Sequence, residues 1–178
     1  MILLDPDKYF SRISHIDVQR DLLDCGFTHA MLDIDNTILA RDTRTIPRDV
    51  AVWLSHARDA GIKFCLVSNS WQEDVFGIAE RLELPIVVKS MKPLPHGYLM
   101  GMRKLGSTRK NTVMVGAQML TDVLGAHLIG MKVYMVQPLV EQDLRHTLML
   151  RNFERVVLAD RATEPLTPAC EQLLRSAE

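Results

Sequence analysis

Apolar residues recur along the chain in two patterns that alternate, as short continuous runs and as longer stretches with helical spacing. The short runs are almost wholly apolar, as expected of strands buried on both faces of a sheet. They predict strands at residues 29–33, 62–67, 85–88, 112–115 and 132–136. Between the runs, apolar positions repeat every three or four residues, as on one face of a helix. This spacing predicts helices at 47–60, 71–82, 94–106 and in a segment that contains Asp122 and ends near Gly130.

The two ends of the chain are predicted to extend this alternating centre. Residues 1–28 are expected to form an N-terminal helical segment, with a helical turn or two at 7–13 and a helix at 17–25. Residues 138–178 are expected to form a C-terminal extension packed on the core. Its elements are predicted at 138–151 (helix), 156–158 (strand or buried turn) and 168–175 (helix).

Strands that alternate with helices of this length favour βαβ units, and therefore a parallel sheet covered by helices on both faces. The predicted fold class is α/β, a Rossmann-like three-layer sandwich with a central, mainly parallel sheet. The chain has 178 residues, of which 47% are hydrophobic, enough for one domain with a substantial core. We therefore expect a single domain over residues 1–178.

Composition excludes several function classes. The net charge is -1, which argues against a general nucleic-acid-binding protein, so no specific nucleic acid is expected as a partner. The cysteines are scattered without metal-ligand spacing. No apolar run approaches the roughly 20 residues of a transmembrane helix, and the first residues do not resemble a signal peptide. We expect a cytoplasmic protein with possible peripheral contact at a membrane, and predict no oligomeric state.

Polar side chains follow several of the predicted strands. Asp33 and Asp35 come at the end of the strand at 29–33, while Ser68 and Gly116 follow two other strands. A turn that caps the first strand would explain its carboxylates alone. Because ligands of such sheets bind beyond the carboxyl ends of the strands, polar groups from distant parts of the sequence instead predict one site at this edge.

The residue types at this edge favour metal-assisted phosphoryl transfer. Two carboxylates about 4 Å apart repel by roughly 4 kcal/mol at an effective dielectric near 20. Lys92 alone would not offset the carboxylates of Asp33, Asp35 and Asp122, whereas Mg²⁺ would, since it prefers oxygen ligands. A carboxylate can act as a nucleophile and form an aspartyl-phosphate. Ser68, Lys92 and backbone N–H groups are candidates to hold the phosphoryl oxygens.

Four short stretches resemble, in order, the motifs of the haloacid dehalogenase (HAD) superfamily. These are Asp33-Ile34-Asp35-Asn36-Thr37 (motif I), Val67-Ser68-Asn69 (motif II), Lys92-Pro93 (motif III) and Gly116-Ala117-Gln118-Met119-Leu120-Thr121-Asp122 (motif IV). The resemblance covers nearly the whole chain and is nearest to the small YqeG-type phosphatases of subclass IIIA, which are similar to mitochondrial phosphatidylglycerophosphate phosphatases. The segments between motifs I and II and between motifs II and III are too short for a cap domain, so a capless fold with an open site is expected.

The resemblance implies a role for each motif residue. Asp33 would be the nucleophile, Asp35 the general acid and then the general base, and Lys92 would steady the nucleophile and the intermediate. The implied Mg²⁺ would be bound by Asp33, Asp35 and Asp122. The implied substrate-binding residues are Asn36, Thr37, Ser68, Asn69 and Lys92.

One position departs from the family pattern. Motif IV usually begins with Gly-Asp, and here Ala117 stands where that Asp, commonly a metal ligand, is expected. The sequence is therefore compatible with two functions. The first is a Mg²⁺-dependent phosphatase acting on a phosphorylated small molecule or a lipid head group, such as phosphatidylglycerophosphate. The alternative is a catalytically impaired HAD-fold protein that binds a phosphorylated ligand or partner.

A polar loop at 39–45 is expected to contribute to selectivity, because it follows motif I and contains Arg41 and Arg44. From the sequence, a solvated loop and an anion-binding loop explain these two arginines equally well.

Overall fold

The computed structural model describes residues 3–70, 74–140, 157–158 and 161–178. Its centre is a six-stranded sheet with the order β1-β6-β5-β2-β3-β4, and all neighbouring strands run parallel. Asp33 follows one of the two middle strands, so its surroundings are built from both sides of the sheet. The strands are β1 (Lys8–Phe10), β2 (His29–Leu32), β3 (Lys63–Val67), β4 (Ile86–Val87), β5 (Thr112–Gly116) and β6 (Lys132–Val136).

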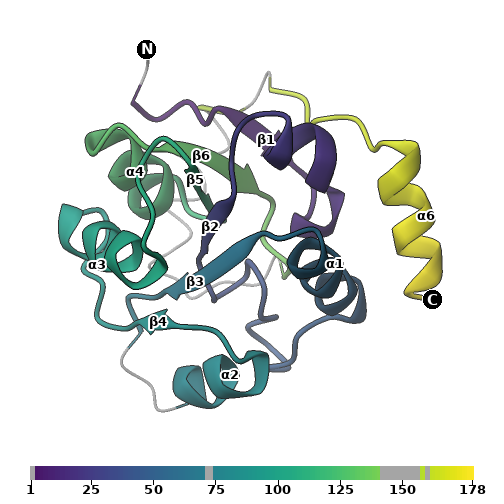
Figure 1. Cartoon of the computed structure of the whole chain (residues 1–178), viewed down its shortest axis with the longest axis horizontal. Helices are drawn as coiled ribbons and strands as arrows, with labels where there is room; N and C mark the ends of the chain where they lie inside the picture. Colours follow the sequence, from purple (N-terminus) through teal and green to yellow (C-terminus); the bar gives the residue numbers. More distant parts are fainter. Residues whose placement is uncertain (1–2, 71–73, 141–156, 159–160) are drawn as a thin grey trace.

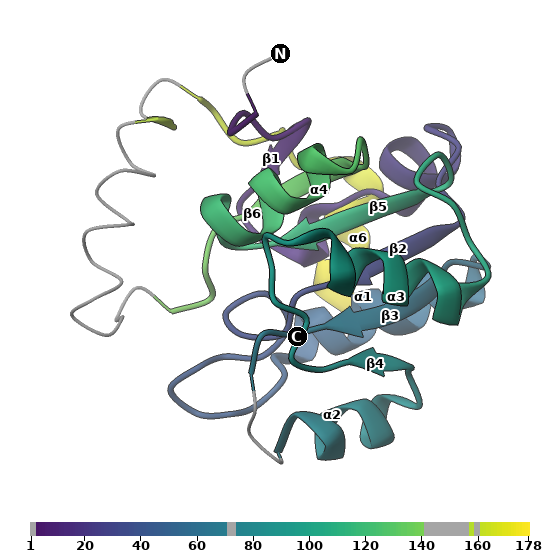
Figure 2. The same cartoon turned by 90° about the vertical axis from the view of Figure 1, so that its left-hand side faces the viewer.

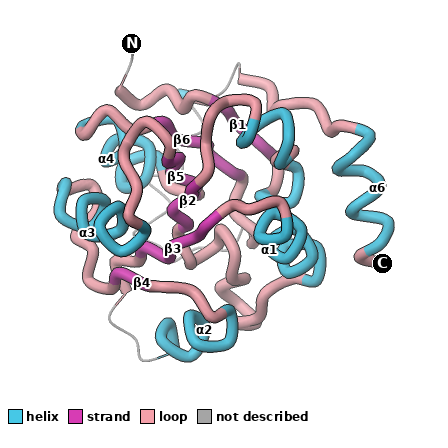
Figure 3. The backbone as a smooth tube through the Cα atoms, in the orientation of Figure 1, coloured by secondary structure: helices cyan, strands magenta, loops and turns pink. Residues whose placement is uncertain are grey.

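Helices cover both faces of this sheet (Figures 1 and 3). One face carries α3 and α4, and the other carries α1, with α6 lying outside α1 (Figure 1). The longer helices are α1 (Arg48–Asp59), α2 (Asp74–Leu82), α3 (Pro95–Leu105) and α6 (Pro168–Ser176). The shorter ones are η1 (Ile13–His15), η2 (Val18–Leu23), η3 (Met119–Val123) and α4 (Leu124–Leu128).

Alternation along the central strand explains why two apolar cores form. Successive side chains of a strand point to opposite faces. Ala30 and Leu32 pack in the core that contains Trp53 of α1, whereas Met31 packs in the core that contains Tyr98 of α3. All five side chains are fully buried. The near-continuous apolar runs of the sequence therefore belong to strands covered on both faces.

The predicted α/β class, the three layers and the parallel sheet are confirmed. The helical turn predicted at 7–13 is wrong, because Lys8–Phe10 form β1 at the edge of the sheet. The cause is tertiary: the Asp7 carboxylate accepts hydrogen bonds from the Lys132 side chain at 2.6 Å and from the Val133 backbone N–H at 2.9 Å. This anchor aligns the segment with β6, which no local pattern in a three-residue strand reveals.

The C-terminal helix α6 and the short helix η1 both pack beside α1. The predicted helix at 168–175 is confirmed by α6, whose preceding residue, Thr167, donates its hydroxyl to Asp17 at 2.6 Å. The helix predicted at 138–151 lies mostly outside the described residues. Of the strand or buried turn predicted at 156–158, Val157 and Leu158 are described; neither is in a strand, and Val157 is exposed. The single domain over residues 1–178 stays a prediction. In the part of the chain that the structure describes, no helix is long and apolar enough to cross a membrane.

Motifs I to III are joined by short connections, as expected for a capless protein. The described residues between Thr37 and Ser68 form a loop, α1 and β3, while those between Ser68 and Lys92 form α2 and β4. In their described parts, neither connection contains an inserted domain. The loop between β2 and α1 instead projects from the edge where the strands end (Figure 2).

A buried carboxylate ties the N-terminal segment to the sheet. The Asp21 side chain is fully buried and accepts hydrogen bonds from Lys8 at 2.7 Å, from Arg20 at 2.8 and 2.9 Å, and from the Asp17 backbone N–H at 2.9 Å. Burial would raise the pKa of Asp21, but the hydrogen bonds from Arg20, Lys8 and Asp17 outweigh it and hold the pKa below its ordinary value. The ionised carboxylate therefore stabilises the fold.

Replacing Asp21 by Ala is expected to lower the free energy of unfolding by about 2–4 kcal/mol, because it removes a buried acceptor and leaves its donors unpaired. Since the pKa is lowered on folding, this contribution is complete above the unfolded pKa, near 4, and is lost as the pH falls through the folded pKa. Urea unfolding at neutral and acidic pH measures both effects.

Asp24→Ala, at an exposed position in the same segment, is the control and should change the free energy of unfolding by less than about 0.5 kcal/mol. Equal effects of the two substitutions would contradict the structural role of Asp21.

Candidate active site

Asp33 lies directly beyond the carboxyl end of β2. Its backbone N–H donates to the Val115 carbonyl at 2.9 Å, which continues the pairing with β5 and fixes the start of the side chain. Its Oδ1 accepts a hydrogen bond from Lys92 Nζ at 2.6 Å, and its Oδ2 accepts one from the Thr37 hydroxyl at 3.3 Å. The carboxylate is thus buried and held from two sides.

A tight turn after Asp33 places Asp35 at the edge of the site. The backbone N–H groups of Thr37, Ile38 and Leu39 all donate to the Ile34 carbonyl, and Asn36 adopts a left-handed conformation with φ 59°. An Asn tolerates this conformation better than most residues. The turn leaves the Asp35 carboxylate partly exposed, with Oδ1 accepting a hydrogen bond from Arg44 at 2.8 Å.

Ser68 and Asn69 follow β3 and have different surroundings. The Ser68 oxygen accepts the Ser70 backbone N–H at 3.0 Å, so its hydroxyl proton can be donated to a ligand. The Asn69 side chain instead bonds to the segment before α3. It accepts the Lys92 backbone N–H at 2.8 Å and the Ser90 hydroxyl at 2.7 Å, and it donates to the Lys92 carbonyl at 3.0 Å. Asn69 therefore positions the backbone of Lys92.

Lys92 connects two carboxylates below the site. Its Nζ donates to Asp33 at 2.6 Å and to Asp122 at 2.7 Å, and its side chain is almost completely buried. The other oxygen of Asp122 accepts the Gln118 backbone N–H at 3.1 Å. A Cβ at Gly116 would lie 2.2 Å from Asp122 Oδ2, so glycine is required for this close approach. The arrangement fixes the ammonium group against Asp33.

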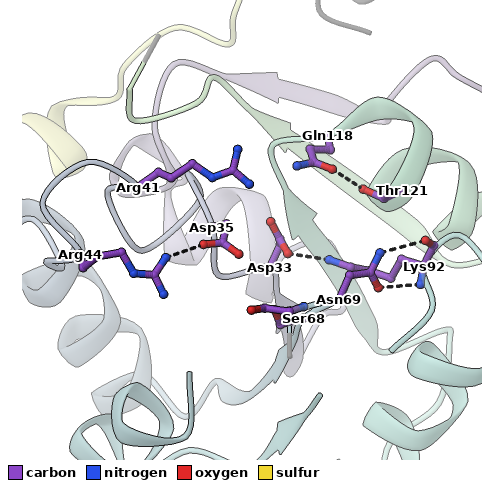
Figure 4. A pocket seen from close by; sticks show the side chains of 10 residues that line it. Asp33, Asp35, Arg41, Arg44, Ser68, Asn69, Lys92, Gln118 and Thr121 are labelled. Carbon is purple, nitrogen blue, oxygen red and sulfur yellow. Dashed lines mark hydrogen bonds and ion pairs between the residues drawn. The ribbon is translucent and has the colours of Figure 1, made fainter. Parts of the chain in front are cut away.

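These residues border one cavity with a volume of about 540 Å³. In Figure 4, Arg41 and Arg44 extend from one side and Lys92 lies on the other, with Asp33 and Asp35 between them. The residues that line it are all polar or charged: Asp33, Asp35, Arg41, Arg44, Ser68, Asn69, Ser70, Lys92, Gln118 and Thr121. The cavity is therefore suited to a polar, anionic ligand.

Buried negative charge exceeds what Lys92 neutralises. Burial raises the pKa of Asp33, the Lys92 charge lowers it, and repulsion from Asp122 and Asp35 raises it again, so the pKa lies above its usual range. Burial lowers the pKa of Lys92, but the charges of Asp122 and Asp33 outweigh burial and raise it, which keeps the ammonium charged. A cation beside Asp33 would relieve the remaining repulsion.

The negative charge of the site favours a divalent cation, whereas the side chains around it offer few ligands for one. Among the described residues, no three His, Cys, Asp or Glu side chains gather as a metal site. Asp122 is fully buried between Lys92 and Gln118 and does not line the cavity. Mg²⁺ is commonly held by one or two carboxylates together with waters and phosphate oxygens. Asp33 and Asp35, the two carboxylates that line the cavity, are the side chains that could hold such an ion.

The alanine at position 117 accounts for one missing metal ligand. Ala117 is buried in the apolar core below the cavity, while its neighbour Gln118 lines the cavity wall. Gln118 Oε1 accepts a hydrogen bond from the Thr121 hydroxyl at 3.1 Å, so this amide is already oriented. A neutral methyl group thus occupies the position where the resembling family usually has a carboxylate.

The structure brings most of the predicted site residues together. Asp33, Asp35, Ser68, Asn69 and Lys92 all line the cavity. Asn36 and Thr37 are buried in the turn behind the cavity wall, with Thr37 in contact with Asp33, and their predicted role in substrate binding stays a prediction. The predicted metal-binding role of Asp122 also stays a prediction, since its observed contacts are to Lys92 and Gln118.

Sequence reasoning missed three contributors. Thr121 and Ser70 line the cavity, and Asp74 at the start of α2 binds Arg44 through the Arg44 Nε at 2.9 Å. Ser70 directly follows motif II and Thr121 lies within motif IV, so both of these had a local signal in the sequence. Arg44 and Asp74 are 30 residues apart, and no pattern in the sequence connects them.

Comparisons with known proteins point to one family. The family model described as "Hydrolase: haloacid dehalogenase-like hydrolase" matches residues 6–130. "Probable phosphatase YqeG" of Bacillus subtilis is 29% identical over 154 residues, covering 86% of this chain and 89% of that protein.

Two solved structures share the fold. An uncharacterized protein from Listeria monocytogenes serotype 4b has a TM-score of 0.53 at 17% identity, covering 66% of this chain and 86% of that chain. A protein from Legionella pneumophila described as a HAD superfamily (subfamily III A) hydrolase has a TM-score of 0.51 at 14% identity, covering 75% of this chain and 76% of that chain.

Proposed function

The chain belongs to the haloacid dehalogenase-like hydrolases, and we propose that it is a Mg²⁺-dependent phosphatase that hydrolyses a phosphomonoester through an aspartyl-phosphate on Asp33. One observation supports this most directly. The Asp33 carboxylate lies at the wall of an open polar cavity, with the Lys92 ammonium 2.6 Å from one of its oxygens. Lys92 screens the negative charge of Asp33 from that of an approaching phosphate.

In the proposed first step, an Asp33 oxygen attacks phosphorus and the bond to the leaving oxygen breaks. The leaving oxygen takes a proton from Asp35, whose partly exposed carboxyl group lies at the open side of the site. The Ser68 hydroxyl donates to a phosphoryl oxygen, and Lys92 compensates the charge that gathers around Asp33. The products of this step are the free alcohol and the aspartyl-phosphate.

In the second step, water attacks the same phosphorus and restores Asp33. Asp35, now ionised, accepts a proton from this water, and the bond between Asp33 and phosphorus breaks to release inorganic phosphate. Arg44 holds Asp35 at 2.8 Å throughout the resting state, which keeps the carboxyl group beside the cavity. A Mg²⁺ ion on Asp33 and the Asp35 carbonyl would supply charge neutralisation for the phosphoryl oxygens.

The substrate class follows from the cavity. Its volume, about 540 Å³, exceeds the needs of a phosphoryl group alone, and its lining is polar. We therefore propose a phosphorylated small molecule, or the phosphorylated head group of a lipid, whose part next to the phosphate is hydrophilic. The phosphatidylglycerophosphate-type substrate is one member of this class.

The alternative is a phosphate-binding protein without turnover. It is supported by Ala117, which removes the usual acidic metal ligand, and by the absence of a three-residue metal cluster among the described residues. Membership in a hydrolase family and the retained Asp33, Asp35, Ser68 and Lys92 favour catalysis.

Hydrolysis of p-nitrophenyl phosphate, measured while Mg²⁺ is titrated against a chelator, tests the proposed function. We expect a rate that rises with Mg²⁺ and saturates only at high concentration, because the ligand set is one carboxylate short. Acid quenching during turnover, followed by peptide mass spectrometry, should find a phosphoryl group on the peptide that contains Asp33. Retention of bound phosphate with no hydrolysis at any Mg²⁺ concentration would favour the alternative.

A further inference from the structure

Arg44 is an oriented guanidinium at the cavity wall. Its NH1 donates to Asp35 at 2.8 Å, its Nε donates to Asp74 at 2.9 Å, and its NH2 also contacts Asp74. These bonds use three of the five N–H donors of the group. Within the described residues, the other two donors remain for a ligand, and the side chain is 32% exposed.

The backbone at Arg44, a residue that lines the cavity, adopts an uncommon conformation. Arg44 has a left-handed conformation with φ 54°, which is unfavourable for a residue with a long side chain. Two hydrogen bonds hold the loop in this form: Arg44 N–H donates to the Ala40 carbonyl and Ala40 N–H donates to the Thr45 carbonyl, both at 2.9 Å. Backbone strain held by surrounding contacts is commonly found at ligand-binding sites.

The cavity extends from Asp33 to the two arginines, so a ligand that fills it reaches beyond the phosphoryl position. Lys92 and Ser68 serve the phosphoryl group, while Arg41 and Arg44 lie at the other side (Figure 4). Asp33 and Asp35, the residue that Arg44 contacts, are two positions apart in the chain and both line the cavity, so a ligand that reaches both spans only a few bonds. A small organic phosphate with a charged group at its far end matches this scale.

We propose that Arg44, which is oriented by its ion pair with Asp74, is a specificity-determining residue that binds a second negatively charged group on the substrate. The preferred substrate class is then a phosphomonoester that carries another anion, a carboxylate or a phosphate, a few bonds from the phosphoryl group. Arginine suits this role because its planar fork binds carboxylate and phosphate oxygens with two parallel hydrogen bonds. The inference rests on the proposed function, since the phosphoryl group is placed at Asp33.

Binding to the Asp33→Asn variant tests this inference without turnover. Isothermal titration calorimetry at one free Mg²⁺ concentration compares 3-phosphoglycerate with glycerol 3-phosphate, which share a carbon chain and differ by one carboxylate. We expect 3-phosphoglycerate to bind at least about tenfold more tightly, as for one charge-assisted bidentate contact. Adding Arg44→Gln should reduce this preference to less than about threefold, by weakening 3-phosphoglycerate binding selectively.

Further variants separate recognition from structure. Arg44→Lys keeps the positive charge but loses the planar guanidinium group. Asp74→Asn keeps the guanidinium group but weakens the ion pair that orients it. Each variant should therefore lose part of the preference for 3-phosphoglycerate over glycerol 3-phosphate. Arg103→Gln, at an exposed position on α3 away from the cavity, should retain it fully. Equal binding of the two ligands, no binding of either, or an equal loss of both in Arg44→Gln would each overturn the inference. Failure of the proposed function would appear separately, as absent hydrolysis by the unmodified chain.

Discussion

Replacing Ala117 by Asp is expected to lower the Mg²⁺ concentration needed for half-maximal hydrolysis by roughly a hundredfold, because the new carboxylate adds one charge next to the ion. Position 117 lies between Gly116 at the end of β5 and Gln118 at the cavity wall. The neighbouring carboxylates of Asp33 and Asp122 are already buried. A carboxylate at position 117 would add to the buried negative charge of this region and so favour a bound cation.

The same substitution has a consequence that does not depend on turnover. Without metal, the new carboxylate would be buried at the apolar position of Ala117 with no added positive charge, so the variant should be less stable than the unmodified chain by about 1–3 kcal/mol. Mg²⁺ should restore this stability, since a ligand that binds the folded state stabilises it. Thermal unfolding in chelator and in Mg²⁺ measures the difference.

Ala117→Asn is the matched control for this experiment. It has nearly the same volume as Ala117→Asp but carries no charge, so it should leave the Mg²⁺ requirement close to that of the unmodified chain. A gain in turnover with Ala117→Asp would show an enzyme that lacks one metal ligand. Tighter Mg²⁺ binding without any turnover would favour the phosphate-binding alternative, and unchanged Mg²⁺ binding would contradict the placement of the metal.

Asp33→Asn is expected to reduce phosphatase turnover by at least about a thousandfold, because an amide cannot serve as the nucleophile that forms the acyl-phosphate. Asn has the same shape as Asp and can still accept the hydrogen bond from Lys92. It also removes a buried negative charge that repels Asp122 and Asp35. The loss of activity should therefore occur in a folded protein whose stability is close to that of the unmodified chain.

Steady-state hydrolysis of p-nitrophenyl phosphate and thermal unfolding together test this expectation. Asp59→Asn, at the exposed end of α1, is the control and should change neither quantity. Residual turnover of the Asp33→Asn variant within tenfold of the unmodified chain would contradict the covalent mechanism. A large fall in stability would assign Asp33 a structural role instead.

Much of the fold follows from the hydrophobic pattern. Runs such as Phe64 to Val67 are buried on both faces of the sheet, and a run of that kind can be recognised without tertiary information. The strand at Lys8–Phe10 could not be found in this way, because it exists through pairing with β6 and through the Asp7 anchor. A short edge strand has too few residues to show a period of its own.

The gathering of the site residues at one edge was predictable where motif residues follow strand ends. Asp33, Asp35, Ser68 and Lys92 could be assigned to one cavity because parallel strands bring their carboxyl ends to the same edge. The nearby sequence is enough for this assignment, because each residue is placed by the strand or turn next to it.

The orientation of each charged group was decided by tertiary structure. Asp122 turns to Lys92 and the Gln118 backbone, and Asn69 holds the Lys92 backbone, although the motifs alone suggested ligands of metal and substrate. Likewise, Arg44 could have been a solvated loop residue, and it is the contact with Asp74 that fixes it at the cavity. The sequence by itself determined which residues meet at this edge, because chain order and strand direction follow from local patterns. Only the packed structure decided which partner each charge has, because that choice depends on distances between groups far apart in the chain.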